Sequence, residues 1–517
     1  MPSKISGELY KVWPYLLIIS VLTLLFYGIG FDRNWSFWAD QELTLGYNGL
    51  LINSGFNQEY IDHPGFFSIQ LIAFLQKIAN WLGLAHLQTI DGFNQSESLF
   101  DSMRYLVITA RHAALVTTIA LVSFTYYVSQ KLTQNVRMSL LVACLVFVSN
   151  GVFYHFTATR TEAIAFAFLL LALYFFIESF KAISAPAPFR LLLALIFFFC
   201  GALNKAQILV LAPFYFCWAS YFINPDQNSK QAVGLPQWLY ALLAPLSYLG
   251  LLYFYSLQSS GKGFLFNCAL VTFFNGLLLL ICFCRKKINH YKALSLFNIG
   301  YWLAYYLTNA LSTWVNEGVS IFGNIADPMS MSRYLFISGG SQILNPQSNL
   351  IASPSLGDKL QAASIFFLSP LVETFGKISS STLLIIFCTI WMFLKRDQLS
   401  KKEFWFGIFC FVSFYIVNLV NKSRYFDAPQ YRIFSEFFLL TYALLLISKM
   451  TKTLQFKVLG GLIFLTVLAN LVPYTHYYNW LIRKGSHPFC HSEVVHTHVQ
   501  MSETRIAEAC AQPGPEH

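Results

Sequence analysis

Long apolar runs alternate with short polar segments along most of the chain. A run of about 20 apolar residues can cross a bilayer as a helix, and the pattern predicts thirteen such spans. They are expected near residues 12–30, 104–128, 137–155, 162–180, 190–203, 206–222, 237–257, 264–284, 293–311, 378–394, 403–420, 432–448 and 458–473. The pattern therefore predicts an all-α polytopic membrane protein, with residues 1–473 as one transmembrane domain and 474–517 as an external tail.

The composition agrees with this prediction. Hydrophobic residues make up 56% of the 517 residues and charged residues only 11%, whereas a soluble domain carries about 25% charged residues. A soluble enzyme and a disordered chain are therefore excluded. The formal net charge of +10 does not indicate a nucleic-acid partner, because the basic residues are not gathered on one soluble face. The aromatic run Phe197–Phe199 is expected to face lipid.

The basic residues predict the orientation of the chain. Lys and Arg cluster in three short loops, at 285–292, 395–402 and 449–457. Cytoplasmic loops of membrane proteins carry an excess of Lys and Arg. We therefore expect the N-terminus in the cytoplasm and the C-terminus outside, with membrane lipid as the partner of these basic loops.

Three long segments are then external, at 31–103, 312–377 and 474–517. The first carries eight acids against two bases. Within it, 42–54 and 65–84 have apolar residues at helical spacing, and Gly55 stops the first of these runs. We expect both to be helices lying at the membrane surface.

Two acids of this loop stand where these helices begin. Asp40 precedes the first helix, and Asp62 with His63 and Pro64 precedes the second. A carboxylate at the water–lipid boundary is partly desolvated, which raises its pKa and suits a general base; several together suit a hard divalent metal. The alternative is that Asp40 is a helix N-cap and His63 is structural.

The order of these residues resembles that of a known family, the C-type membrane glycosyltransferases. The branch it resembles comprises the bacterial protein O-mannosyltransferases and lipid A aminoarabinose transferases, which are similar to dolichyl-phosphate-mannose-protein mannosyltransferases. The residues that carry the resemblance are Trp38–Glu42, Gly55, Asp62–Pro64, Ala158–Glu162, Gly201–Lys205, Arg424-Tyr425 and Gln430–Arg432. Where the family usually has two consecutive acids, this chain has Asp40 followed by Gln41.

The resemblance implies an inverting glycosyltransferase in the bacterial inner membrane, with its site facing the periplasm. The sugar would come from a polyprenyl-phosphate carrier, and the acceptor would be a glycolipid, a polysaccharide or a protein. Asp40 would be the general base, and Glu162 would position the acceptor. The candidates for binding a divalent metal are Asp40, Glu42 and Glu162.

The carrier phosphate needs cations at the outer face, where arginine suits bidentate contact. The candidates are Arg160, Lys205, Lys262, Arg333, Lys422, Arg424 and Arg432. Glu42, Asp62, His63, Tyr425 and Tyr431 complete the predicted substrate-binding set.

Structural alternatives stay open for these candidates. The cations could snorkel at the interface. Glu162 could form a structural pair with Arg160. Arg111, with its neighbours Arg104 and His112, could pair with the loop acids rather than with a ligand.

Other functions are compatible with the same sequence. A transporter or flippase of lipid-linked sugars is the main alternative; it would show paired halves and spans broken at Gly or Pro, with charges at mid-membrane. An O-antigen polymerase or ligase and an inactive, partner-binding relative are further alternatives. The tail could hold a metal through its histidines or form a Cys490–Cys510 disulfide.

Overall fold

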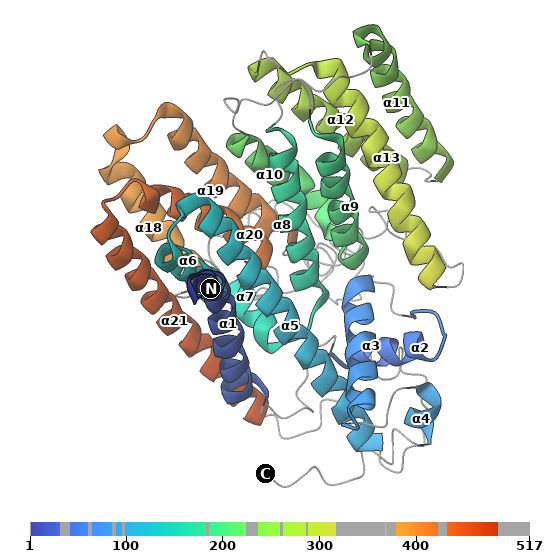
Figure 1. Cartoon of the computed structure of the whole chain (residues 1–517), viewed down its shortest axis with the longest axis vertical. Coiled ribbons are helices and arrows are strands. Elements are labelled where there is room, and N and C mark those ends of the chain that lie inside the picture. Colours follow the sequence, from blue (N-terminus) through green and yellow to red (C-terminus); the bar gives the residue numbers. More distant parts are fainter. Residues whose placement is uncertain are drawn as a thin grey trace, which may run out of the picture. The chain divides into compact units, whose positions relative to one another are not determined.

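A computed structural model gives the fold of most of the chain. It describes residues 2–31, 42–59, 65–84, 89–95, 99–181, 186–223, 236–258, 262–285, 288–316, 368, 379–421 and 432–483. All regular secondary structure in these ranges is helical (Figure 1). The fold class predicted from the sequence, an all-α multi-pass membrane protein, agrees with this architecture.

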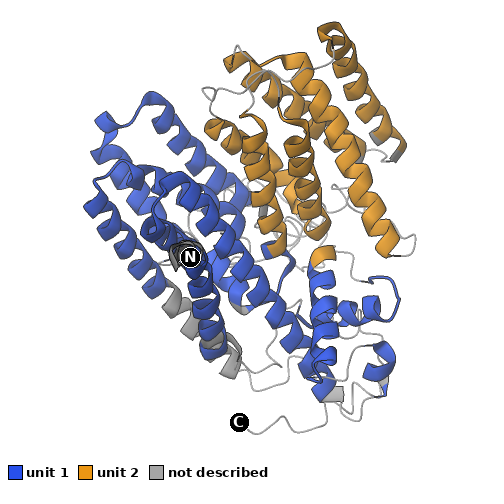
Figure 2. Ribbon diagram, viewed as in Figure 1, with its two compact units in different colours: residues 1–60, 68–163, 343–517 blue, residues 61–67, 164–342 orange. Residues whose placement is uncertain are grey.

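The chain divides into two compact units (Figure 2). Unit 1 comprises Met1–Tyr60, Ser68–Ala163 and Ile343–His517; unit 2 comprises Ile61–Phe67 and Ile164–Gln342. The helices of unit 1 are α1 (Pro2–Leu25), the π-helix η1 (Phe26–Phe31), α2 (Glu42–Asn53), most of α3 (Phe66–Trp81), α4 (Ile90–Asn94), α5 (Leu99–Thr133), α6 (Val136–Val148), α7 (Asn150–Thr157), α18 (Ser380–Leu394), the 3-10 helix η3 (Arg396–Gln398), α19 (Lys401–Asn421), α20 (Arg432–Ser448) and α21 (Lys452–Arg483).

Unit 2 is a helical bundle. Its helices are α8 (Thr161–Ser179), whose first turn belongs to unit 1, α9 (Pro188–Asn204), α10 (Gln207–Phe222), α11 (Gln237–Gln258), α12 (Lys262–Cys284) and α13 (His290–Val315). Its core is aromatic: the ring of Phe216 lies 4.8 Å from that of Phe274 and 5.7 Å from that of Phe198, all at edge-to-face angles. Phe198 and Phe199 are buried, so the expectation that this run faces lipid was wrong. These rings pack against one another because edge-to-face contacts stabilise aromatic pairs.

The thirteen predicted spans all coincide with helical segments. In the described part of the chain, six helices are long and apolar enough to cross a membrane, and a bent pair could be a seventh. Four further apolar helices are shorter, at Val12–Gly28, Pro188–Asn204, Gln207–Phe222 and Ser380–Leu394. The multi-pass helical class is therefore supported, while the number of thirteen crossings stays a prediction.

The continuous span predicted at 137–155 is broken in the structure. Helices α6 and α7 meet at Ser149 with a bend of 75°. The first backbone N–H groups of α7 find partners on other helices: Asn150 N donates to Ser380 Oγ at 2.9 Å, and Gly151 N donates to Glu436 Oε2 at 3.1 Å. The break is possible because these contacts satisfy groups that a helix end leaves without intrahelical partners.

Both helices expected in the first external loop are present, as α2 and α3. Gly55, with φ +78°, follows the end of α2. Residues 42–51 are all buried, because α2 packs against α5 and α3; Gln76 Nε2 donates to Gly46 O at 2.9 Å. Helix α2 is thus enclosed by protein more completely than a helix lying at the membrane surface is expected to be.

The close contact between Gly151, at the α6–α7 break, and the backbone of Ile433 gives a first prediction. A Cβ on Gly151 would lie 2.2 Å from Ile433 N, a backbone atom that cannot turn away. We therefore expect Gly151→Ala to destabilise the protein by about 1–3 kcal/mol through overpacking. Gly460→Ala in α21 is the matched control, because a Cβ there meets nothing within 4 Å. Thermal unfolding in detergent checks the pair; equal midpoints for the two variants would contradict the prediction.

Candidate functional site

The structure describes some of the predicted site residues and leaves others out. Those within its described ranges are Glu42, Arg160, Glu162, Lys205 and Arg432. Those outside are Asp40, Asp62, His63, Arg333, Lys422, Arg424, Tyr425 and Tyr431, together with the tail cysteines and histidines. The side chain of Lys262 is likewise not described.

Glu42 forms a buried ion pair at the start of α2. Its side chain is 0% exposed, and its Oε2 accepts a hydrogen bond from Arg111 Nε on α5 at 3.2 Å. Its other oxygen, Oε1, accepts from the backbone N–H of Thr159 at 3.2 Å. The hydroxyl of Thr159 in turn donates to the carbonyl of Ala110. These contacts fix the extended segment between α7 and α8 against α2 and α5.

A second buried ion pair lies in the same segment. Arg160 Nε donates to Glu162 Oε2 at 3.3 Å, and both side chains are buried. Glu162 stands in the first turn of α8, where a carboxylate is favoured by the helix dipole. The structural pairing of Glu162 with Arg160 that the sequence left open is therefore present.

Together these residues form what we call the acid–arginine cluster: Glu42, Arg111, Thr159, Arg160 and Glu162. It belongs to unit 1 and holds two carboxylates and two guanidinium groups, all buried. Buried charges of opposite sign interact strongly because water does not screen them. In the described ranges no group of three His, Cys, Asp or Glu side chains could hold a metal ion.

Arg111 completes the cluster, although the predicted substrate-binding set did not include it. Pairing with the loop acids was one of the two roles expected for Arg111, and it does pair with Glu42. Its neighbour His112 is bound by helix and aromatic contacts: its Nδ1 lies 2.8 Å from Ile108 O, and its Nε2 lies 3.2 Å from the hydroxyl of Tyr27.

Lys205 lies in unit 2, at the tight turn between α9 and α10 that the sequence predicted. It is 0% exposed. The preceding carbonyl, Asn204 O, accepts from Gly65 N at 3.0 Å, and Gly65 directly follows the predicted Asp62-His63-Pro64 segment in the chain. The contact therefore ties the chain after this segment to the Lys205 turn.

The sequence analysis missed Gln207 at the same turn. It is the first residue of α10 and only 5% exposed, and neither of its amide atoms has a hydrogen-bond partner among the residues that the structure describes. Because Cα–Cβ bonds tilt toward the helix N-terminus, its side chain extends toward the turn that holds Lys205. A buried amide of this kind is costly unless a partner binds it. The sequence feature that could have identified Gln207 is a polar residue at the start of an otherwise apolar helix.

Arg432 stands at the start of α20, near a buried acid that the sequence analysis also missed. Within the described part of the chain, the buried Nη1 atom of Arg432 has no hydrogen-bond partner. One turn later, Glu436 Oε1 accepts from the hydroxyls of Ser380 and Ser381, each at 2.5 Å. Glu436 interrupts an apolar run just as Glu162 does, so the same criterion could have found it.

The ion pair between Glu42 and Arg111 gives a second prediction. Glu42→Gln and Arg111→Gln should each cost about 3–5 kcal/mol, because each leaves one buried charge unpaired. The double variant should recover part of this loss, with a coupling energy of about 0.5–3 kcal/mol. Lys181→Gln is the control, since its pair with Glu178 is half-exposed and should contribute about 0–1 kcal/mol. Unfolding free energies in detergent measure all four, and strictly additive losses would contradict the coupling.

Comparison with known proteins gives no relative for this chain. No family model, no curated protein and no solved structure matches it. Its function therefore has to be argued from its own residues and their contacts.

Proposed function

We propose that the protein is an inverting glycosyltransferase that moves a sugar from a polyprenyl-phosphate carrier to an acceptor at the outer face of the membrane. The observation that carries the proposal is the buried acid–arginine cluster. It fixes Glu42 and Glu162, two of the acids that the resemblance selected, and Asp40 lies two residues before Glu42 in the chain. Buried carboxylates in membrane proteins mark functional sites more often than structural ones.

The proposed reaction is a single displacement at the sugar's anomeric carbon. The acceptor hydroxyl attacks that carbon and forms the new glycosidic bond. The bond between the carbon and the phosphate oxygen breaks, and polyprenyl phosphate leaves with the electron pair. Asp40 accepts the proton of the acceptor hydroxyl as general base. The attack from the opposite face inverts the anomeric configuration.

The remaining cluster residues act in proposed supporting roles. Glu162, held by Arg160, positions the acceptor, and Glu42, held by Arg111, fixes the start of α2 next to Asp40 in the sequence. The pairing matters because a carboxylate whose rotamer is fixed loses less entropy when it orients a substrate. The acceptor is a glycolipid, a polysaccharide or a protein.

Cations at the outer face bind the carrier phosphate in this proposal. Lys205 is the proposed phosphate contact within the described residues, because it lies buried at the tight turn between α9 and α10 that the resemblance selected. Gln207 adds an amide donor and acceptor at the same turn. The residues proposed to complete the donor site are Arg160, Arg333, Arg424, Arg432, Tyr425, Tyr431, Asp62 and His63.

The proposed location is the bacterial inner membrane. The apolar runs predict thirteen spans, and the basic loops then favour a cytoplasmic N-terminus and a periplasmic C-terminus. The active site then faces the periplasm, where lipid-linked sugars reach acceptors of the cell envelope.

A transporter or flippase of lipid-linked sugars is the second candidate. The observation that favours it is the break between α6 and α7, which is the broken span expected of a transporter. The buried carboxylate of Glu436 lies at this break and binds Gly151 N. A conformational change that separates α7 from α20 would expose this acid.

Sugar transfer is the central test. The protein in nanodiscs is incubated with a panel of polyprenyl-phosphate sugars and with glycolipid, polysaccharide and protein acceptors, and release of the free carrier is measured. Asp40→Asn should lower turnover by about 10²–10⁴-fold, because the general base is lost. Lys205→Met should raise KM for the donor. Glu178→Gln, which alters an acid with half-exposed partners, should leave turnover unchanged.

Full turnover in Asp40→Asn would contradict the role of Asp40 as general base. One further outcome would overturn the enzyme proposal itself. Absence of turnover with every donor, combined with carrier or ion movement in liposomes that Glu436→Gln abolishes, would establish the transporter instead.

The role of a divalent metal can be tested separately. Of the three proposed ligands, Glu42 and Glu162 each contact a guanidinium group, which already supplies the positive charge that a metal would provide. We therefore expect sugar transfer to continue in excess EDTA. Loss of turnover on chelation, with recovery on adding Mg²⁺ or Mn²⁺, would contradict this expectation and show that the reaction requires a metal.

A further inference from the structure

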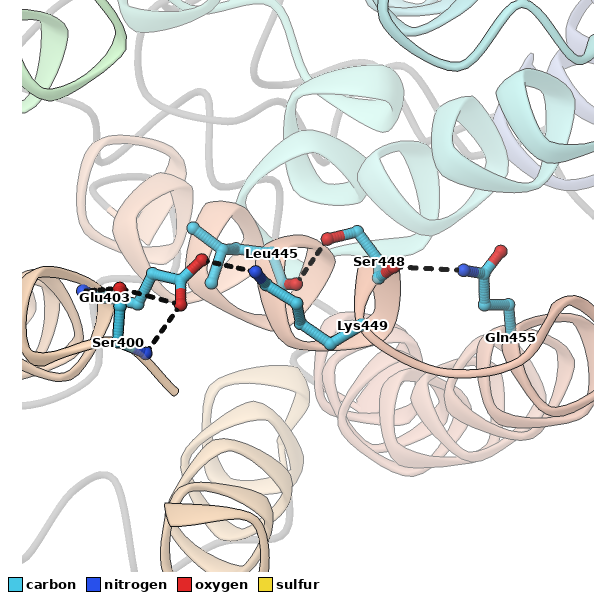
Figure 3. Close-up of polar contacts among 6 residues, drawn as sticks. All are labelled: Ser400, Glu403, Leu445, Ser448, Lys449 and Gln455. Carbon is cyan, nitrogen blue, oxygen red and sulfur yellow. Dashed lines mark hydrogen bonds and ion pairs between the residues drawn. The ribbon is translucent and has the colours of Figure 1, made fainter. Parts of the chain in front are cut away.

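Two basic loops of unit 1 are joined by an ion pair. Lys449, in the turn between α20 and α21, places its Nζ 2.6 Å from Glu403 Oε1 in the first turn of α19. Figure 3 shows this contact between the first turn of α19 and the turn that follows α20. The pair joins two segments that lie 46 residues apart in the sequence. It therefore brings the turn before α19 and the turn after α20 together on one surface.

Local hydrogen bonds hold both turns in place. Ser400 and Glu403 form a reciprocal cap of α19: Ser400 N donates to Glu403 Oε2 at 2.9 Å, and Glu403 N donates to Ser400 Oγ at 3.2 Å. At the other turn, Gln455 Nε2 donates to Ser448 O at 3.3 Å (Figure 3). It also donates to Met450 O at 2.9 Å. A capping box and a bridging amide restrict both turns, so the charges they carry keep a fixed arrangement.

The surface carries a large excess of positive charge. Glu403 is neutralised by Lys449, which leaves Asp397 as the remaining acid in 395–403 and 449–457. Apart from Lys449, the basic residues of these two segments are Lys395, Arg396, Lys401, Lys402, Lys452 and Lys457. Five of these six are exposed and Lys395 is partly exposed. We call these six residues the two-loop basic surface.

Large apolar side chains are interleaved with these charges. Phe393 and Leu394 directly precede Lys395 and are exposed, as are Trp405 in α19 and Leu454 in α21. The guanidinium of Arg396 also lies 5.8 Å from the centre of the Phe404 ring. A nucleic acid or an acidic soluble protein would leave this apolar area in water, whereas a lipid covers apolar and basic groups together.

We propose that the two-loop basic surface is a binding site for the headgroup of an anionic phospholipid. The phosphodiester lies among the six cations, and the acyl chains cover the neighbouring apolar side chains. Clusters of four to eight Lys and Arg residues beside membrane helices bind anionic lipids in this way. The site is independent of the proposed glycosyltransferase activity, because it involves none of the residues assigned to the reaction.

Lipid titration of the full chain tests the proposal. The detergent-purified protein is titrated with phosphatidylglycerol or with phosphatidylcholine, and bound lipids are counted by native mass spectrometry. We expect a saturable phosphatidylglycerol site that phosphatidylcholine does not occupy. Lys401→Gln/Lys452→Gln should weaken this site by roughly fivefold per charge removed. The matched control is Lys77→Gln/Lys131→Gln, which removes two exposed charges elsewhere in unit 1.

Each result decides for or against the site. Equal binding of the two lipids, or equal weakening by both double variants, would overturn the proposal and leave only a diffuse charge effect. Displacement of phosphatidylglycerol by inorganic phosphate at the same concentration would identify an anion site without lipid preference and would also overturn it. A thermal midpoint equal to that of the wild-type protein confirms that the variants are folded.

Discussion

The ion pair between Glu42 and Arg111 is the contact on which the arrangement of unit 1 depends. The carboxylate joins three segments, since it binds the guanidinium on α5 and the backbone of Thr159 while standing at the first residue of α2. In a protein surrounded by lipid, a buried charge without a partner costs several kcal/mol. The start of α2 and the chain entering α8 are therefore held together by the requirement that this charge be neutralised.

The same requirement explains the break at Ser149. A helix that stops inside a membrane protein exposes N–H groups that lipid cannot satisfy. Here Ser380 and Glu436 accept those of Asn150 and Gly151. Helix α7 can therefore leave the direction of α6 and carry the chain toward Thr159. The two buried acids, Glu42 and Glu436, thus fix the two ends of the segment that connects α6 to α8.

The sequence predicted the helices well because their apolar runs are long and their ends are marked by charges, glycine or proline. It did not predict the bend at Ser149, because residues 137–155 read as one apolar run and the partners of the bend lie more than 200 residues away. Glu162 was found as an acid in an apolar helix, whereas Glu436 fitted the same criterion and was overlooked. Gln207 carries no charge and belongs to no motif, so its place at the start of an apolar helix was a weak signal, and its burial without a hydrogen-bond partner among the described residues is what distinguishes it.

Charges in this protein serve two different physical purposes. In the acid–arginine cluster, acids and arginines are buried and matched one to one, which fixes backbone segments and leaves little field outside. In the two-loop basic surface, six cations face a single acid and are mostly exposed, so their field extends about a Debye length into the solution. Buried charges that are paired one to one favour a site of fixed geometry. Exposed cations without matching acids favour binding of an anionic group from outside the protein. The contrast is why we assign chemistry to the first and a lipid headgroup to the second.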